Sequence, residues 1–421
     1  KATHMVITGS YFHLGDDDYH GNDNAYIGST DHRGRGYATS TLDVYGNVTV
    51  TSRQNVNTAL DIGWSNYPDN ANGTLNVGGN VLIGGRGGSA AINLAGIIEG
   101  KERHDVTGHL NIAGDLTIEQ GGSLNLIFGG ENNYEGTITA SVKTKTLNLY
   151  GTILSWPTLF KNKTVNADYD YGDAVIHNGG YLVTTTPTKG VETNTFNTLT
   201  LEAGSTLANA TGLIIGNKTN GAVTIASTLN LNGGAVGNQG SLSQYQGAVN
   251  VNSGSYGFGT YSKSNGVLTN RSTLSITQFN QSNGATSNTG NLTIGNANLY
   301  GSLSNTGTLN LTGTVTSRGN LSSSGTLNNK GNWTEANTYA ISGNLNNTGS
   351  VNFQNGFTLA SNSRLTSSGT LQTNNAYNIF DSLGTTGQQD LHYVSLNSTA
   401  PQEIKTSLSD FFQKYVAGTV A

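Results

Sequence analysis

The sequence predicts an all-β protein: a right-handed parallel β-helix, or solenoid, with an N-terminal cap and a C-terminal capping segment. Two observations carry this prediction. A short segment of alternating apolar and polar residues recurs along the chain, and a Gly beside Asn or Asp divides most copies into two strands. Such alternation indicates half-buried strands, and the Gly permits a sharp corner between them. Because each strand offers only two inward apolar residues, neighbouring copies must stack to form a core; the right-handed sense follows the general rule for parallel crossovers.

The recurring segment is clearest at Leu42–Val50, where two strands flank Gly46-Asn47. Further copies begin at Leu75 and Leu110. A fourth begins at Leu147 and keeps the Gly but lacks the Asn or Asp. We expect equivalent residues to stack, Leu over Leu and Val over Val, at a rung spacing of about 4.8 Å.

Composition supports a solenoid and excludes several classes of protein. Of 421 residues, 58 are Gly and only 11% are charged, while cysteine is absent, which excludes disulfides and thiolate metal sites. No apolar run is long enough to span a membrane, and the net charge of −5 argues against nucleic acid as a partner. The lack of cysteine suits an exported bacterial protein, and we expect the start at Lys1 to be a processed or cloned N-terminus.

In chain order, we expect one elongated body of four regions. Residues 1–40 form an N-terminal cap and the first rungs, and their acidic loop at Asp16–Asp18 is interpreted as a solvated loop, with a Ca²⁺ site as the alternative. Residues 41–198 form charged rungs decorated with loops. Residues 199–375 form a loop-poor shaft rich in Asn, Thr and Ser. Residues 376–421 form the C-terminal cap, with helical spacing over residues 405–416.

The charge is unevenly distributed between these regions. Residues 1–173 contain 18 acidic and 11 basic side chains, whereas no acidic residue lies between Glu202 and Glu335. From residue 199 the strands carry apolar pairs such as Leu309/Leu311, and the figure Gly-x-Leu recurs, as in Gly301–Leu303 and Gly307–Leu309. The second half is therefore expected to be a plain, nearly neutral stack.

A second motif precedes the early copies. Ile27-Gly28, Ile62-Gly63 and Ile98-Glu99-Gly100 each lead through a polar loop to the next strand, and Ile214–Ile225 shows a similar figure with a short loop. Ile-Gly, a loop, Gly-x-Leu-x-Val and a further strand resemble the passenger repeats of autotransporter (type V secretion) adhesins, which have a pectin-lyase-like β-helix. The resemblance implies an autochaperone-like C-terminal cap and a membrane β-barrel translocator outside this chain as a partner.

The loops after the Ile-Gly pairs are a candidate binding site. Stacking of the repeats should bring successive loops to one edge, and their aromatic and charged side chains suit sugar stacking and recognition of carboxylate or sulfate by Arg. The alternative is that these loops are polar only because they are solvated. The candidate residues are Asp31, His32, Arg33, Arg35, Tyr37, Trp64, Tyr67, Asp69, Lys101, Arg103 and His104.

The outward positions of the shaft are a second candidate site. They are Asn, Thr and Ser with almost no charge, and stacked side chains of this kind form hydrogen-bonded ladders that leave donors and acceptors unused. Two such faces offer many weak contacts in parallel. The alternative is that these residues serve only stacking within the chain. The representative positions are Asn230, Asn250, Asn310, Thr326 and Asn346.

These observations predict a cell-surface or secreted adhesin of a Gram-negative bacterium that promotes aggregation or biofilm by binding itself on neighbouring cells, with host attachment as a further role. The main alternative is a module that binds host glycans or matrix proteins through the loops. A polysaccharide lyase or hydrolase and a two-partner-secreted haemagglutinin are less favoured. Paired carboxylates at Asp168, Asp170 and Asp173 could serve a glycosidase, but we expect these residues to form a single local turn. We expect no enzymatic activity, no catalytic residues, no metal and no cofactor.

Overall fold

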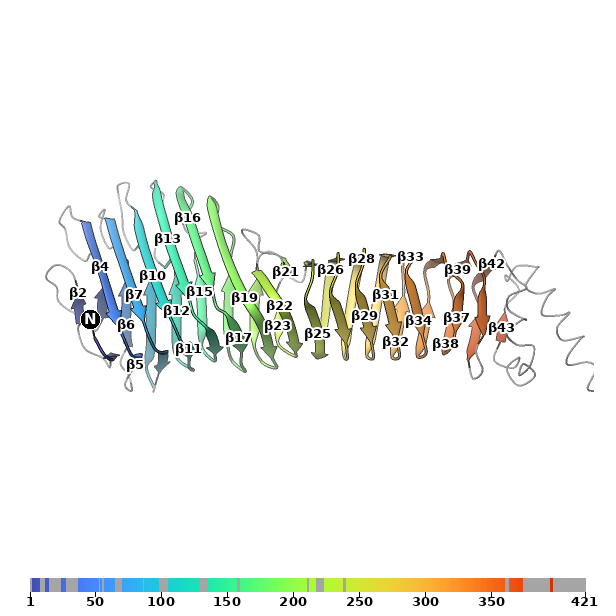
Figure 1. Cartoon of the computed structure of the whole chain (residues 1–421), viewed down its shortest axis with the longest axis horizontal. Coiled ribbons are helices and arrows are strands. Elements are labelled where there is room, and N and C mark those ends of the chain that lie inside the picture. Colours follow the sequence, from blue (N-terminus) through green and yellow to red (C-terminus); the bar gives the residue numbers. More distant parts are fainter. Residues whose placement is uncertain are drawn as a thin grey trace, which may run out of the picture. The chain divides into compact units, whose positions relative to one another are not determined.

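The computed structural model describes most of the chain: residues 2–7, 12–14, 24–27, 37–52, 54, 57–64, 70–85, 87–97, 105–128, 135–156, 160–209, 212–216, 223–237, 240–359, 363–373 and 394–396. These residues form strands and turns, and the strand pairings between neighbouring rungs are parallel. The prediction of an all-β parallel β-helix is thereby confirmed. The chain divides into two compact units, Lys1–Asn238 and Gln239–Ala421, and Figure 1 shows the stacked strands of each.

Unit 1 has three-sided rungs whose strands form three parallel sheets. The first contains β4 (Tyr37–Val44), β7 (Asn70–Val77), β10 (Val106–Ile112), β13 (Gly136–Lys143), β16 (Lys163–Asp170), β19 (Gly190–Glu202), β22 (Val223–Asn232) and β21 (Leu213–Ile215). The second contains β1 (Met5–Ile7), β5 (Val48–Ser52), β8 (Val81–Gly85), β11 (Asp115–Ile118), β14 (Thr146–Leu149) and β17 (Asp173–Ile176), and is continued by the later halves of β19 and β22.

The third sheet of unit 1 contains β2 (Phe12–Leu14), β3 (Asn24–Ile27), β6 (Asn57–Ile62), β9 (Ser89–Leu94), β12 (Gly122–Leu126), β15 (Thr152–Ser155), β18 (Tyr181–Thr184), β20 (Thr206–Asn209) and β23 (Ala235–Val236). The core lies between the three sheets. Leu42, Leu75 and Leu110 occupy successive register positions and are almost completely buried, as the stacking of equivalent residues predicts.

Three details of the predicted repeats are wrong. Leu147 stacks on Leu116 in the second sheet, and not on Leu110 in the first, because similar Gly corners recur at more than one edge of a rung and do not identify the side. In the third copy the residue pair equivalent to Ile62-Gly63 is Leu94-Ala95, upstream of Ile98-Glu99-Gly100, which lies outside the described residues.

The third difference is at Ile214-Ile215. Its strand β21 pairs directly with β22, whereas Ile62 belongs to a different sheet from the strand that follows it. The Ile-Gly position itself has a physical role, since the residue after the third-sheet strand has a positive φ in three consecutive rungs: 62° at Gly63, 54° at Ala95 and 51° at Ile127. The amide of each donates to the rung before it, at 2.9–3.0 Å.

Unit 2 is also three-sided. Face 1 contains the first halves of β26 (Ser255–Lys263), β28 (Thr273–Gln281) and β30 (Asn291–Leu299), followed by β32 (Thr308–Leu311), β35 (Thr326–Asn329), β38 (Asn344–Asn347), β41 (Arg364–Ser367) and β43 (Val394–Leu396). Face 2 contains β24 (Ser241–Gln244), the second halves of β26, β28 and β30, then β33 (Thr314–Ser317), β36 (Asn332–Glu335), β39 (Ser350–Phe353) and β42 (Thr370–Thr373).

Face 3 contains β25 (Ala248–Ser253), β27 (Val267–Asn270), β29 (Ala285–Asn288), β31 (Ser302–Asn305), β34 (Asn320–Ser323), β37 (Tyr339–Ile341) and β40 (Phe357–Leu359). From β31 to β35 each four-residue strand is followed by a two-residue corner that ends in Gly, as at Gly313, Gly319 and Gly325. A Cβ on Gly325 would meet the carbonyl oxygen of Gly307 in the rung before it. Glycine is therefore required where successive corners are in close contact.

The predicted caps fall largely outside the described residues. At the N-terminus β1 pairs with β5, which agrees with a strand beginning at Met5, but the Asp16–Asp18 loop is not described. Near the C-terminus the described strand Val394–Leu396 stacks on β41 as part of the next rung. The expected terminal helix at residues 405–416 lies outside the described residues.

Candidate functional site

Face 1 of unit 2 presents two columns of outward side chains, and we call these residues the ladder face. In the strands of this face the residues at alternate positions are buried, so those between them point outward. All are Ser, Thr or Asn except Arg364. The residues are Thr273, Ser275, Asn291, Thr293, Thr308, Asn310, Thr326, Asn328, Asn344, Asn346, Arg364 and Thr366.

Hydrogen bonds between rungs order the ladder face. The Nδ2 of Asn310 donates to Oδ1 of Asn291, that of Asn328 to Oδ1 of Asn310, and that of Asn346 to Oδ1 of Asn328, each at 2.9 Å. A primary amide has two N–H groups and two acceptor lone pairs, and these bonds occupy one of each on Asn328. The remaining donor and acceptor are available at the surface, and the ladder holds them in fixed positions. The predicted ladder is thus present.

The structure brings together three of the five predicted self-association residues. Asn310, Thr326 and Asn346 belong to the ladder face. Asn250 lies in β25 on face 3 of the same unit. Asn230 belongs to unit 1, where its Nδ2 donates to Oγ1 of Thr200 at 3.2 Å.

The described surface of unit 2 has no exposed carboxylate. Its cations Arg271, Arg318, Lys330 and Arg364 are exposed, while the one acidic residue of its described ranges, Glu335, is 1% exposed. Two copies of this surface would therefore meet without attraction between opposite charges. The repulsion between the four exposed cations is weak at physiological salt, where the Debye length is about 8 Å.

Glu335 lies inside unit 2 beside aromatic rings. Its Oε1 accepts the amide of Asn337 at 3.2 Å. Ser317 and Trp333 approach the carboxyl group and oppose the effect of burial, but neither forms a hydrogen bond of normal geometry. Burial dominates and raises the pKa of Glu335 to about 7. The group is structural, since it has no access to solvent from which a substrate would reach it.

Sequence reasoning missed a second, interior set of amides. Asn270, Asn288 and Asn305 end successive strands of face 3 and are at most 1% exposed. Asn270 donates to Asn288 at 2.7 Å, Asn288 to Asn305 at 2.6 Å, and Asn305 to Oγ of Ser323 at 2.9 Å. A parallel interior ladder joins Asn329, Asn347 and Ser367. The signal in the sequence is position: these Asn residues stand two places after a buried Leu or Thr, and so on the inward side of the strand.

The predicted loop site lies almost wholly outside the described residues. This applies to Asp31, His32, Arg33, Arg35, Tyr67, Asp69, Lys101, Arg103 and His104. The backbone of Tyr37 begins β4, and Trp64 is 7% exposed, with its ring beside Gly96. The described strand ends do stack: Ile27 pairs with Ile62, and Tyr37 pairs with Asn70. Successive loops therefore leave and re-enter the rungs at equivalent positions.

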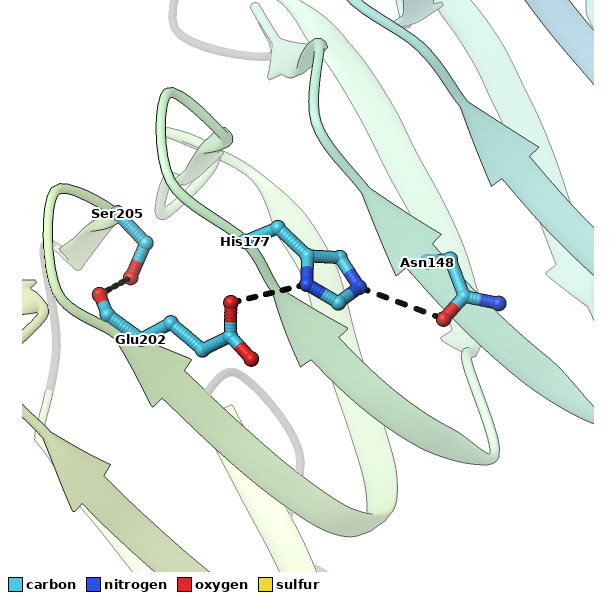
Figure 2. Close-up of polar contacts among 4 residues, drawn as sticks. All are labelled: Asn148, His177, Glu202 and Ser205. Carbon is cyan, nitrogen blue, oxygen red and sulfur yellow. Dashed lines mark hydrogen bonds and ion pairs between the residues drawn. The ribbon is translucent and has the colours of Figure 1, made fainter.

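A polar cluster lies on the second sheet of unit 1 (Figure 2). The ring of His177 stacks on Tyr150, with centroids 4.0 Å apart. Its Nδ1 lies 3.0 Å from Oε2 of Glu202 and its Nε2 lies 3.5 Å from Oδ1 of Asn148. Oγ of Ser205 donates to the backbone carbonyl of Glu202 and does not face the imidazole. The cluster joins neighbouring rungs and lacks the nucleophile that a hydrolytic triad requires.

One buried carboxyl group of unit 1, that of Glu192, is also satisfied by its neighbours. Glu192 accepts hydrogen bonds from Oγ of Ser155 at 2.7 Å and from Nδ2 of Asn194 at 3.1 Å, and burial raises its pKa. Among the described residues no group of three or more His, Asp or Glu side chains is placed to hold a metal ion. In the same ranges no helix is long and apolar enough to cross a bilayer.

The fold and the ladder face define a parallel β-helix protein with an extended polar surface that carries no carboxylate among the described residues. Comparison with known proteins adds no relative, because no family model, curated protein or solved structure matches the chain.

Proposed function

We propose that the protein is an adhesin of the bacterial cell surface or the secreted fraction that binds further copies of itself through the ladder face. The observation that carries the proposal is an ordered row of Asn and Thr side chains with spare hydrogen-bonding groups and no carboxylate. The passenger-like Ile-Gly and Gly-x-Leu repeats support an autotransporter origin, a bacterial surface location and a role in cell aggregation or biofilm.

The energetics favour a long, repetitive contact. A hydrogen bond exchanged with water contributes about 0.5–1.5 kcal/mol, so one amide pair binds weakly. The ladder repeats the same groups at every rung, and copies displayed on two cells engage many contacts in parallel. Because the Asn310, Asn328 and Asn346 side chains are already held by each other, little side-chain entropy remains to be lost on binding.

The test is the clumping of cells that display the protein. Thr308→Glu with Asn344→Glu adds two charges to the ladder face, two rungs apart. The matched control, Ser304→Glu with Ala340→Glu, adds the same charge to face 3 in the corresponding rungs. We expect the first pair to abolish clumping and the control to retain it, and we expect soluble wild-type protein to compete. Equal clumping of cells that display either variant would contradict the proposal.

A second candidate function is binding of host glycans or matrix proteins by the loops of unit 1. The register of the flanking strands supports it, since Ile27 stacks on Ile62 and Tyr37 on Asn70, so the loop ends recur along one edge. Replacing Arg33, Arg35 and Arg103 with Ala should then weaken binding on a glycan array without changing clumping. Unchanged glycan binding by this triple variant would exclude the loop site.

A further inference from the structure

A groove runs across the rungs of unit 1 at the corner between its first and second sheets. It has a volume of about 400 Å³ and is lined by Asp43, Val44, Tyr45, Asn76, Val77, Gly78, Asn111, Ile112, Ala113 and Lys143. None of the functional residues proposed above belongs to it. It therefore provides a site that is separate from the ladder face and from the loops.

The groove arises from the side chains that follow the first-sheet strands. Val44, Val77 and Ile112 stack in register, and the residues after them are Tyr45, Gly78 and Ala113. Gly78 is required there, because a Cβ would meet the carbonyl oxygen of Tyr45. At the position equivalent to the exposed Tyr45, the next two rungs therefore carry the small residues Gly78 and Ala113. The space beside the Tyr45 ring stays open over these two rungs, roughly 10 Å.

The two sides of the groove differ chemically. Its lining is predominantly apolar, contributed by Tyr45 and the edges of Val44, Val77 and Ile112. Along one side Asn76 donates to Asp43 at 2.9 Å and Asn111 donates to Asn76 at 2.9 Å. Each of these bonds uses one N–H of its amide, which leaves the second N–H of Asn76 and of Asn111 to face a ligand.

Lys143 completes this side, since it pairs in register with Asn111 in the next rung. It is exposed and forms no ion pair with any residue that the structure describes. An apolar strip beside amide donors and a cation suits a pyranose ring, whose C–H face stacks on an aromatic ring while its hydroxyl edge accepts hydrogen bonds. The cation adds a preference for an acidic substituent.

We propose that this groove binds an acidic oligosaccharide, with a pyranose ring against Tyr45 and a carboxylate or sulfate at Lys143. Asn76 and Asn111 would hold the hydroxyl edge between them. The site acts by binding alone, and it would give the protein affinity for a glycan surface in addition to its affinity for itself.

The test is calorimetric titration of the full chain with an oligogalacturonate, a sulfated dextran oligosaccharide and neutral dextran of the same length. We expect binding of at least one acidic probe, with weaker binding of the neutral one. Lys143→Gln should weaken acidic binding about tenfold, as loss of a charge-assisted hydrogen bond predicts, while leaving neutral binding unchanged. Lys145→Gln, a nearby exposed cation outside the groove, should have no such effect.

Ala113→Tyr provides a second test that does not remove a contact. Ala113 is exposed, so the larger side chain should be tolerated while it fills the groove and abolishes binding. Retention of a wild-type circular dichroism spectrum and melting curve would show that the fold is intact. Absence of binding by both acidic probes, or binding unchanged by Ala113→Tyr and Lys143→Gln, would overturn the proposal. Neither result would affect the clumping of cells.

Discussion

Replacing Asn288 with Ala tests the interior ladder of unit 2 directly. In the folded protein Oδ1 of Asn288 accepts from Asn270 at 2.7 Å, and its Nδ2 donates to Oδ1 of Asn305 at 2.6 Å and to the carbonyl of Thr308 at 2.9 Å. Asn288 is fully buried. Water cannot take the place of the lost amide without entering the core.

The expected loss follows from the groups left behind. Asn270 keeps the carbonyls of Ser272 and Asn291 as acceptors, at 3.2 and 3.1 Å. Losing its hydrogen bond to Asn288 therefore costs little free energy. The buried Oδ1 of Asn305 loses its donor, which costs about 1–3 kcal/mol, and the space vacated by the amide adds a cavity. We therefore expect Asn288→Ala to lower the free energy of unfolding by about 2–4 kcal/mol.

The assay is amide hydrogen exchange, combined with urea denaturation. In a solenoid each rung contacts only its neighbours, so the loss of protection should concentrate in β27, β29 and β31. Asn310→Ala is the matched control: it removes ladder bonds on the half-exposed outer face, where water replaces them, and should cost less than about 1 kcal/mol. Equal losses in the two variants would refute the reasoning that burial gives the interior ladder its importance.

Three further predictions concern pH, corner geometry and salt. Because burial raises the pKa of Glu335 from its ordinary 4.5 to about 7, the folded state binds the proton more tightly than the unfolded state does. The stability that this group contributes is fully present below about pH 4.5 and is lost as the pH rises to about 7. The Glu335→Gln variant should lack this pH dependence. At pH 8 it should be more stable than the wild type by up to about 3 kcal/mol, measured by urea denaturation. A variant with the wild-type pH profile would contradict the assignment. Gly325→Ala should destabilise unit 2 by about 1–3 kcal/mol, because the new Cβ meets the carbonyl of Gly307, while Ser324→Ala at the exposed neighbouring position should be neutral in the same assay. Raising the salt concentration should strengthen self-association by screening Arg271, Arg318, Lys330 and Arg364, and should weaken acidic-glycan binding at Lys143; the same direction of change in both would be inconsistent with this electrostatic account.

Much of the fold could be predicted from the sequence because stacking imposes the same requirement on every rung. The alternation around Leu42, Leu75 and Leu110 identified inward residues correctly, and these three leucines do stack. The recurrence of Gly-x-Leu at Gly301 and Gly307 marks the six-residue sides of a three-sided rung.

The sequence is less informative where one local pattern serves several positions. The repeat pattern places Leu147 over Leu110 in the first sheet, one side away from its true position over Leu116, because the Gly corners are alike. The loop that follows an Ile-Gly pair also varies in length, so the equivalence of Leu94-Ala95 with Ile62-Gly63 becomes clear only from the register.

The same ambiguity applies to the polar residues of the candidate site. Asn310 and Asn288 have the same chemistry, but one is half-exposed on a face and the other is buried at a corner. Their position relative to the neighbouring buried residues distinguishes them: Asn310 directly follows a buried residue and points outward, whereas Asn288 stands two places after one and points inward. The groove beside Tyr45 depends on the absence of side chains at Gly78 and Ala113, and its formation requires the stacking of residues more than 30 positions apart.

The central claim is that ladder faces, which carry no carboxylate, bind each other, and sedimentation velocity over a range of protein concentrations tests it most directly. The account predicts that wild-type protein and the Ser304→Glu/Ala340→Glu variant form larger species as concentration rises, whereas Thr308→Glu/Asn344→Glu remains monomeric. A wild-type protein that stays monomeric at the highest concentration, or a ladder-face variant that assembles as the wild type does, would contradict it.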